Sequence, residues 1–181
     1  MHKFPFLLLF ILMAATFNLK AQTDCAIPLD ADDNTFKYGE VVEVAGVNKD
    51  ELFERAMAWI KNEYVNAANK LDADAKEKGV IDLDGRFRVE ERNSKGKRQG
   101  DMIVEYRLNI LFKDGRYKYE FYKFHLNKGY FFALERWLDP NVTEAGTKTE
   151  ECEQVNDHIL EKIAAMKEAI ANPEVEEEEE W

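Results

Sequence analysis

The sequence contains few of the side chains that usually carry out catalysis. Serine occurs once, as Ser94, and histidine occurs three times, as His2, His125 and His158. No Gly-x-Ser-x-Gly, His-x-His or His-Glu-x-x-His pattern is present, and there is no glycine-rich phosphate-binding loop. The sequence therefore predicts no catalytic residues, no metal site and no cofactor.

Cysteine is also scarce, because Cys25 and Cys152 are the only two. Two interpretations stay open. In an oxidising compartment the pair forms a disulfide, and closing so long a loop adds about 4 kcal/mol in the entropic account. In a reducing compartment both remain free thiols. Lipid attachment to Cys25 is not expected, because Gln22 and Asp24 stand where a lipoprotein signal has an apolar and a small residue.

Positive charge is in short supply, with 25 Lys and Arg against 36 Asp and Glu and a net charge of −11. Many of the acids lie in residues 173–181, which we expect to form a disordered acidic tail. A surface of this sign repels the phosphates of nucleic acids and of anionic lipids. We therefore expect an envelope protein or another ligand as the partner, and no nucleic acid.

No apolar run is long enough to span a bilayer. The longest, Pro5 to Phe17, has 13 residues, whereas a spanning helix needs about 20. With Lys3 before it and Ala21 after it, this run predicts a secretory signal peptide over residues 1–21. Its removal takes away Lys3 and Lys20 but no acid, so the net charge moves from −11 to −13. We expect an exported protein, periplasmic or extracellular, without stable membrane insertion.

The segment after the leader predicts a strand followed by a helix. Phe36–Val44 is rich in aromatic and β-branched residues, as strands are. Asn48 is a typical N-cap, and Glu51 three positions later completes a capping box. Apolar residues then recur at helical spacing from Leu52 to Leu71. The pattern predicts one long helix with a single buried face.

A β-hairpin is predicted around Asp114-Gly115, a dipeptide typical of two-residue type I′ turns. Apolar side chains occupy the even positions from Met102 to Phe112. Beyond Phe121 the apolar positions shift by one, which predicts a β-bulge near Phe121 and Tyr122. The turn sets the register of the pairs on the apolar face: Phe112 with Tyr117, Ile110 with Tyr119, and Leu108 with Phe121.

The remaining elements complete an α+β domain. Val80–Glu90 alternates as a strand, and a polar loop, Asn93–Gly100, joins it to the hairpin. Tyr130–Leu138 fits either a strand or a helix, and Cys152–Ile170 predicts a second amphipathic helix. We expect an antiparallel sheet of four to five strands with two helices packed on one face. Residues 22–35 form an unstructured leader and residues 36–172 the single domain.

Two motifs resemble a known bacterial family. The stretch Gly46-Val47-Asn48-Lys49-Asp50-Glu51-Leu52, continuing to Trp59, resembles the helix start of domain of unknown function 4468 (DUF4468). Lys113-Asp114-Gly115-Arg116-Tyr117, with Tyr119 and Phe124, resembles its hairpin. The resemblance covers roughly residues 36–126 and implies a TATA-box-binding-protein-like (TBP-like) fold and a secreted location. It supplies no catalytic residues, and DNA binding would need a basic sheet surface that this acidic chain lacks.

Two groups of basic residues are candidate binding sites. Lys95, Lys97 and Arg98 cluster in the predicted loop, and Arg86, Arg88 and Arg107 lie on the polar face of the predicted sheet. Either group can steer an anionic partner. A solvated loop and a solvated sheet face are the simpler account of these residues.

Two functions from different classes are consistent with these residues. The first is a non-catalytic envelope module that binds a protein or other ligand through its polar sheet face or loops. The second is a glycan hydrolase using Asp82 and Asp84, which lie on one strand face about 7 Å apart, within the range of catalytic carboxylate pairs. A solvated ladder of charges is the simpler account of that pair.

Overall fold

The computed structural model describes residues 25–64, 71, 73–93, 95–142 and 148–173. The predicted signal peptide, the acidic tail beyond Pro173, and Ser94 lie outside the described residues. Among the helices in the described ranges, none combines the length and the apolar character needed to cross a bilayer.

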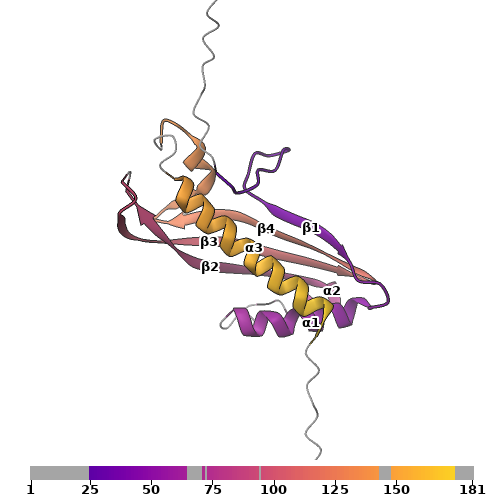
Figure 1. Ribbon diagram of the computed structural model, residues 1–181. Coiled ribbons are helices and arrows are strands. Elements are labelled where there is room, and N and C mark those ends of the chain that lie inside the picture. The colour runs from indigo at the N-terminus through magenta and orange to yellow at the C-terminus, as the bar shows by residue number, and fades with distance from the viewer. Residues whose placement is uncertain (1–24, 65–70, 72, 94, 143–147, 174–181) are drawn as a thin grey trace, which may run out of the picture.

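Five strands form one antiparallel sheet (Figure 1). β1, β4, β3 and β2 lie side by side in that order, and β5 pairs with the last residues of β4. β1 and β2 are therefore edge strands. The bounds in chain order are β1 (Tyr38–Glu43), β2 (Val80–Arg92), β3 (Arg98–Lys113), β4 (Arg116–Asn127) and β5 (Phe131–Ala133).

Helices cover one face of this sheet, which confirms the predicted α+β architecture. They are α1 (Lys49–Glu63), the short α2 (Ala75–Lys78), the 3-10 helix η2 (Leu134–Leu138) and α3 (Thr149–Ala171). α3 runs across the sheet, since Gln154 bonds to Glu90 of β2 and Lys167 pairs with Glu40 of β1 (Figure 1). Tyr106, Phe121, Phe124, Ile159 and Met166 are among the buried side chains between the layers.

α1 begins as predicted and ends earlier than predicted. The Asn48 side chain accepts a hydrogen bond from the Glu51 backbone N–H at 2.9 Å. The helix stops at Glu63, not Leu71, because Tyr64 leaves the helical conformation at φ −123° and ψ 102°. Its hydroxyl instead forms a 2.9 Å hydrogen bond with that of Tyr106 on β3, which draws the chain onto the sheet.

The β3–β4 hairpin has the predicted register: Phe112, Ile110 and Leu108 pair with Tyr117, Tyr119 and Phe121. The bulge lies slightly later than predicted. Arg107 still pairs with Tyr122 and the register shifts only before Glu105 meets His125. Lys123 supplies the extra residue at φ 55°. Tyr122 therefore points to the uncovered face and not into the core.

Two connecting segments differ from expectation. The predicted loop Asn93–Gly100 is a short turn, because the Asn93 side chain accepts hydrogen bonds from the Lys95 and Lys97 N–H groups at 2.9 and 3.0 Å. β3 already begins at Arg98. The ambiguous segment Tyr130–Leu138 contains both structures, the strand β5 and then the 3-10 helix η2.

The described part of the predicted leader, residues 25–35, contains no helix or strand but is tied to the domain. Ile27 is buried, and Leu29 forms an isolated β-bridge with Phe36. Cys25 forms a disulfide with Cys152 at the start of α3, across a separation of 127 residues. Of the two interpretations of the cysteines, the structure shows the disulfide.

His158 on α3 gives stability a predictable pH dependence. Its ring stacks on Phe87 with the centroids 3.9 Å apart, and burial, helped by Lys162, lowers its pKa below the ordinary value of 6.5. Below pH 6.5 the unfolded chain therefore takes up this proton more readily than the folded chain, so the free energy of unfolding falls as the pH is lowered. Urea titrations from pH 7.5 to pH 5, a range that extends roughly a unit or more on either side of 6.5, should show this fall in the free energy of unfolding for the wild type. It should be smaller in His158→Phe, and an equal loss in both proteins would rule out His158 as its source.

Candidate functional site

The sheet face opposite α1 and α3, here called the outer face, is the candidate site because none of the described helices covers it. Every second residue of each strand points to it. It carries charges of both signs across its whole width. Residues that pair across neighbouring strands form rows on this face. Three such rows are Glu43–Arg116–Lys113, Val41–Lys118–Leu111–Val80 and Gly39–Glu120–Asn109–Asp82.

On the β2–β3 side, carboxylates hold three of the six predicted basic residues. Arg107 donates to Asp82 at 2.7 Å, and Arg88 lies 3.3 Å from Asp101. Arg98 also bonds to Asp101, at 2.6 Å, and lowers the pKa of that carboxyl. These groups are largely exposed and in water, so each pair adds little to stability.

Asp84 and Arg86 differ from their neighbours on this face. Asp84 raises the pKa of Arg107 only from a distance, because Asp82 is the partner that bonds to it. Among the described residues, no ion pair includes Asp84 or Arg86. The carboxylate pair of the hydrolase hypothesis therefore lies on an open face, with Asp82 already bound to an arginine.

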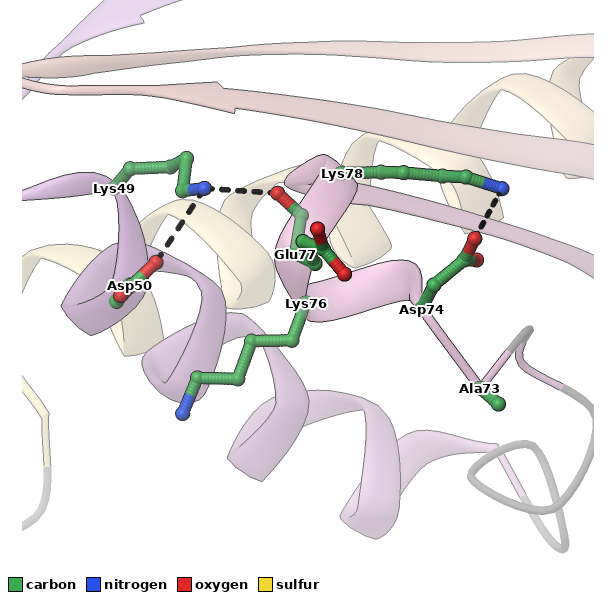
Figure 2. A pocket seen from close by; sticks show the side chains of 7 residues that line it. All are labelled: Lys49, Asp50, Ala73, Asp74, Lys76, Glu77 and Lys78. Carbon is green, nitrogen blue, oxygen red and sulfur yellow. Dashed lines mark hydrogen bonds and ion pairs between the residues drawn. The ribbon is translucent and has the colours of Figure 1, made fainter.

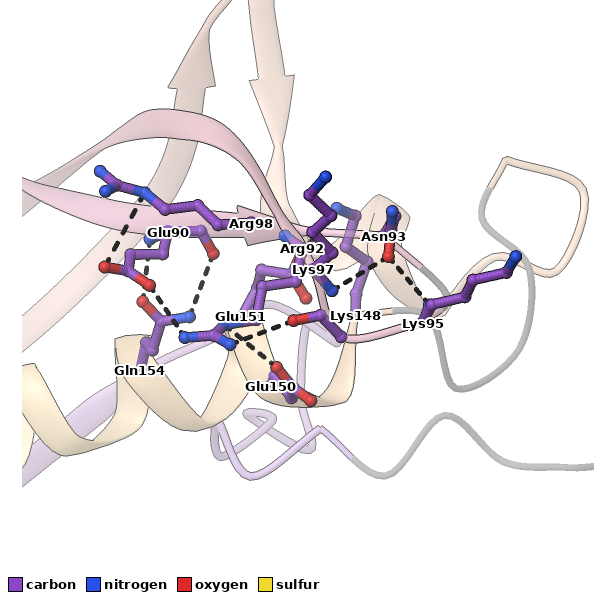
Figure 3. Close-up of polar contacts among 11 residues, drawn as sticks. Glu90, Arg92, Asn93, Lys95, Lys97, Arg98, Lys148, Glu150, Glu151 and Gln154 are labelled. Carbon is purple, nitrogen blue, oxygen red and sulfur yellow. Dashed lines mark hydrogen bonds and ion pairs between the residues drawn. The ribbon is translucent and has the colours of Figure 1, made fainter.

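The basic cluster of the sequence is divided by the structure. Lys95 and Lys97 project from the β2–β3 turn, whereas Arg98 lies in β3 and turns toward Glu90 (Figure 3). Arg98 also pairs with Asp101. Arg92 beside them is held by Glu90 and Glu150 of α3. The structure therefore brings Arg86, Arg88 and Arg107 onto one face and leaves the two lysines apart at the turn.

A groove of about 320 Å³ on the outer face was missed by the sequence reasoning. Val41 and Leu111 form its floor, on either side of Lys118, with which both pair. Lys113 and Arg116 at the end of the same hairpin complete the rim. A signal was present: Val41 and Leu111 are apolar residues at positions where the alternation puts polar ones, but nothing in the sequence places them side by side.

A larger hollow, about 930 Å³, opens between α1 and α2 (Figure 2). Its cations already have partners. Lys49 donates to the Glu77 carbonyl at 3.0 Å, Lys76 pairs with Glu54 at 2.5 Å, and Lys78 pairs with Asp74 at 2.8 Å. These contacts occupy the three lysines of the lining, so the hollow offers an anionic ligand no lysine without a partner.

Metal-ligating and titratable side chains of the described residues give two further observations. No three His, Cys, Asp or Glu side chains within the described ranges gather as a metal site would require. In the hydrogen-bonded pair Tyr64–Tyr106, burial raises the pKa of both hydroxyls, that of Tyr106 to about 12. At neutral pH both hydroxyls therefore stay protonated, and they lie in the core under the helices.

The comparisons with known proteins agree with this fold. Residues 38–127 match the family described as a domain of unknown function (DUF4468) with TBP-like fold. The chain is similar to a TBP-like protein from Parabacteroides distasonis, with a TM-score of 0.62 and 19% identity over 82% of this chain and 99% of that one. It is also similar to a DUF4468 family protein from Bacteroides ovatus, with a TM-score of 0.53 and 15% identity over 81% of this chain and 92% of that one.

At these identities the two likenesses establish the fold alone. No curated protein matches the chain significantly. The order of strands and helices, the hairpin register and the family match over the sheet together show that this chain belongs to the DUF4468 family with its TBP-like fold.

Proposed function

We propose that this protein is an exported, non-catalytic module that binds an acidic segment of a partner protein in the groove of the outer face. The single observation that carries the proposal is the groove itself, an apolar floor surrounded by cations on a chain whose net charge is −11. Arg86, Arg88 and Arg107 lie farther along the same face and extend the surface available to the partner.

The floor of the groove favours an apolar side chain. Val41 is 50% exposed and Leu111 is 41% exposed, although each lies within a strand of the sheet. Covering them removes apolar surface from water, which stabilises a complex by about 25 cal/mol per Å². A volume of about 320 Å³ is sufficient for a large side chain and not for a second domain.

The rim favours carboxylates beside that side chain. Lys113 has no ion pair with any described residue, and Arg116 is held only by Glu43, at 3.8 Å. Lys118 bonds to Glu120 at 2.8 Å and leans away from the floor toward the next row. Because the protein as a whole repels anions at long range, recognition depends on close contact with these three cations, and only a matching segment gains from it.

Export is part of the proposal and is supported by two features. The Cys25–Cys152 disulfide is consistent with an oxidising compartment, and residues 1–21 have the composition of a signal peptide. Fractionation of the native host followed by N-terminal sequencing should find the protein outside the cytoplasm and starting near Gln22. Recovery from the cytoplasm with Met1 still present would contradict export.

The groove is tested with peptides that place one aromatic residue among glutamates, and with matched peptides that carry lysines instead. Fluorescence anisotropy should show binding of the acidic set only. Reversing the rim charges in Lys113→Glu/Arg116→Glu/Lys118→Glu should weaken it roughly tenfold or more, since several ion pairs of a few tenths to 1 kcal/mol are lost together. Reversing the turn cluster in Lys95→Glu/Lys97→Glu/Arg98→Glu changes the net charge equally and should have little effect.

The outcomes separate the candidate surfaces. Loss of binding in the turn variant alone would move the site to the cluster predicted from sequence and overturn the groove. Equal binding of acidic and basic peptides would exclude charge recognition. The chain carries acidic residues of its own at Glu174–Glu180, so a full-length variant with those glutamates changed to glutamine is included. Tighter peptide binding by that variant would show that the tail competes for the groove.

A further inference from the structure

The free edge of β2 has a regular set of backbone groups that no described residue uses. Glu90 donates its N–H to the Gln154 side chain at 2.9 Å and accepts from it at 3.1 Å, so its backbone faces away from β3 (Figure 3). Alternation along an antiparallel strand turns Asp82, Asp84, Arg86 and Arg88 the same way. The β2–β3 register is regular over this stretch, which keeps the alternation intact.

α3 closes one end of this edge and leaves the rest open. The amide of Gln154 satisfies both backbone groups of Glu90 as a neighbouring strand would, and Glu151 accepts the Arg92 N–H at 3.2 Å. No described residue outside the β2–β3 ladder bonds to the backbone of Asp82, Asp84, Arg86 or Arg88. A second strand can therefore pair with β2 up to Arg88 and no farther.

The charges along this stretch are complementary to the same stretch read in the opposite direction. On the outer face, two aspartates precede Gly85 and two arginines follow it: Asp82, Asp84, Arg86 and Arg88. Edge strands that are protected against association usually carry charged side chains, especially lysine, or a proline. Here the signs are opposite on the two sides of a central glycine, so the edge attracts a copy of itself that runs antiparallel.

We propose that two copies of this protein associate through the β2 edges, antiparallel, with a two-fold axis at Gly85. Asp84 then faces Arg86 of the second copy and Asp82 faces Arg88, and both pairs occur twice by symmetry. All four residues have the backbone orientation that a hydrogen-bonded pair requires. Gly85 and its copy form the pair without hydrogen bonds at the axis, where two strands approach most closely and no side chain intervenes.

The register is selected by charge. Moving the axis by one residue, to Asp84 or to Arg86, places that residue opposite its own copy. Moving it by two, to Leu83 or Phe87, places Asp82 opposite Asp84 or Arg86 opposite Arg88. Registers centred between two residues would pair an outward-facing backbone with an inward-facing one. Only the axis at Gly85 makes every charged pair on the outer face opposite in sign. The groove itself lies on β1, β4 and the end of β3 and not on the β2 edge, so failure of this dimer would leave binding in the groove untouched.

The test is sedimentation equilibrium of the mature protein as a function of concentration. The wild type should form a dimer that weakens with added salt, because the charge pairs are exposed. R86D converts both central pairs to like charges and should raise the dimer dissociation constant roughly tenfold or more. The double variant D84R/R86D restores opposite charges and should restore the dimer. Lys61→Glu, an exposed change on α1 with the same change in net charge, is the control and should dimerise like the wild type.

Hydrogen exchange supplies the second measurement, since it reports on the backbone. The amides of Asp84 and Arg86 should become more protected as the wild type is concentrated, and should not in R86D. A wild type that stays monomeric at every soluble concentration overturns the proposal. So does a dimer that R86D leaves intact, or a monomeric R86D that D84R/R86D fails to rescue, because the interface or its register would then be another one.

Discussion

Reduction of the Cys25–Cys152 disulfide should lower the free energy of unfolding by about 2–5 kcal/mol, the range found for native disulfides of small secreted proteins. The bond closes a loop of 127 residues, which includes the whole sheet. It also fixes the segment before β1 to the start of α3, where Cys152 is fully buried. In its absence the contacts of Ile27 and the Leu29–Phe36 bridge must be maintained without a covalent tether.

Urea denaturation with and without reductant measures this effect as a lower midpoint in the reduced protein. Cys25→Ala/Cys152→Ala should resemble the reduced wild type and should not respond to reductant. If the wild-type midpoint stays the same after complete reduction, confirmed by thiol titration, the disulfide contributes no stability and the constraint on the unfolded chain is not the reason for its presence.

Gly85→Ala should be the most damaging single methyl addition among the glycines of the sheet. A Cβ atom at this position would lie 2.2 Å from Cζ and 2.5 Å from the hydroxyl of Tyr106. The ring cannot easily retreat, because its hydroxyl is bonded to Tyr64 and it packs against Phe121 and Phe124. Overpacking of this kind costs roughly 1–3 kcal/mol, more than an alanine would gain over glycine through strand propensity.

Gly100→Ala is the matched control, since a Cβ at Gly100 on β3 meets no atom within 4 Å. Thermal and urea denaturation should place Gly85→Ala well below the wild type and Gly100→Ala close to it. Adding Tyr106→Leu to Gly85→Ala should cost less than the sum of the two single changes, because the contact is then absent. Strict additivity, or a Gly85→Ala protein as stable as Gly100→Ala, would show that the ring adapts without cost.

Local patterns in the sequence predicted much of the fold because they act over a few residues. The Asn48 cap, the Asp114-Gly115 turn and the alternation of Met102 to Phe112 each depend on neighbours along the chain, and each appears in the structure. The pattern was less informative where an aromatic residue suits two environments. Tyr64 ends α1 early because it bonds to Tyr106 on β3. Tyr122 on β4 turns outward, where it pairs with Arg107, also on β3.

The candidate site depended on tertiary structure more than the fold did. The sequence identified Arg86, Arg88 and Arg107 as residues of one polar face, and the structure places them there. It could not show that Val41 and Leu111 meet across Lys118, since β1 pairs with β4 and not with its nearest strand along the chain. Nor could the sequence show that β2 is an edge strand, because the order of the strands depends on pairings between residues far apart along the chain.

Periodicity and charge were enough to determine an acidic α+β protein with one sheet face buried against helices. Periodicity and charge determine which side of each helix or strand faces water, and they can be read from neighbouring residues along the chain. Tertiary contacts alone decided that Cys25 reaches Cys152, that Gly85 lies beneath Tyr106, and that Val41 borders one groove with the distant hairpin residues Leu111, Lys113, Arg116 and Lys118. The physical reason is that these contacts join residues whose separation along the chain carries no information about their distance in space.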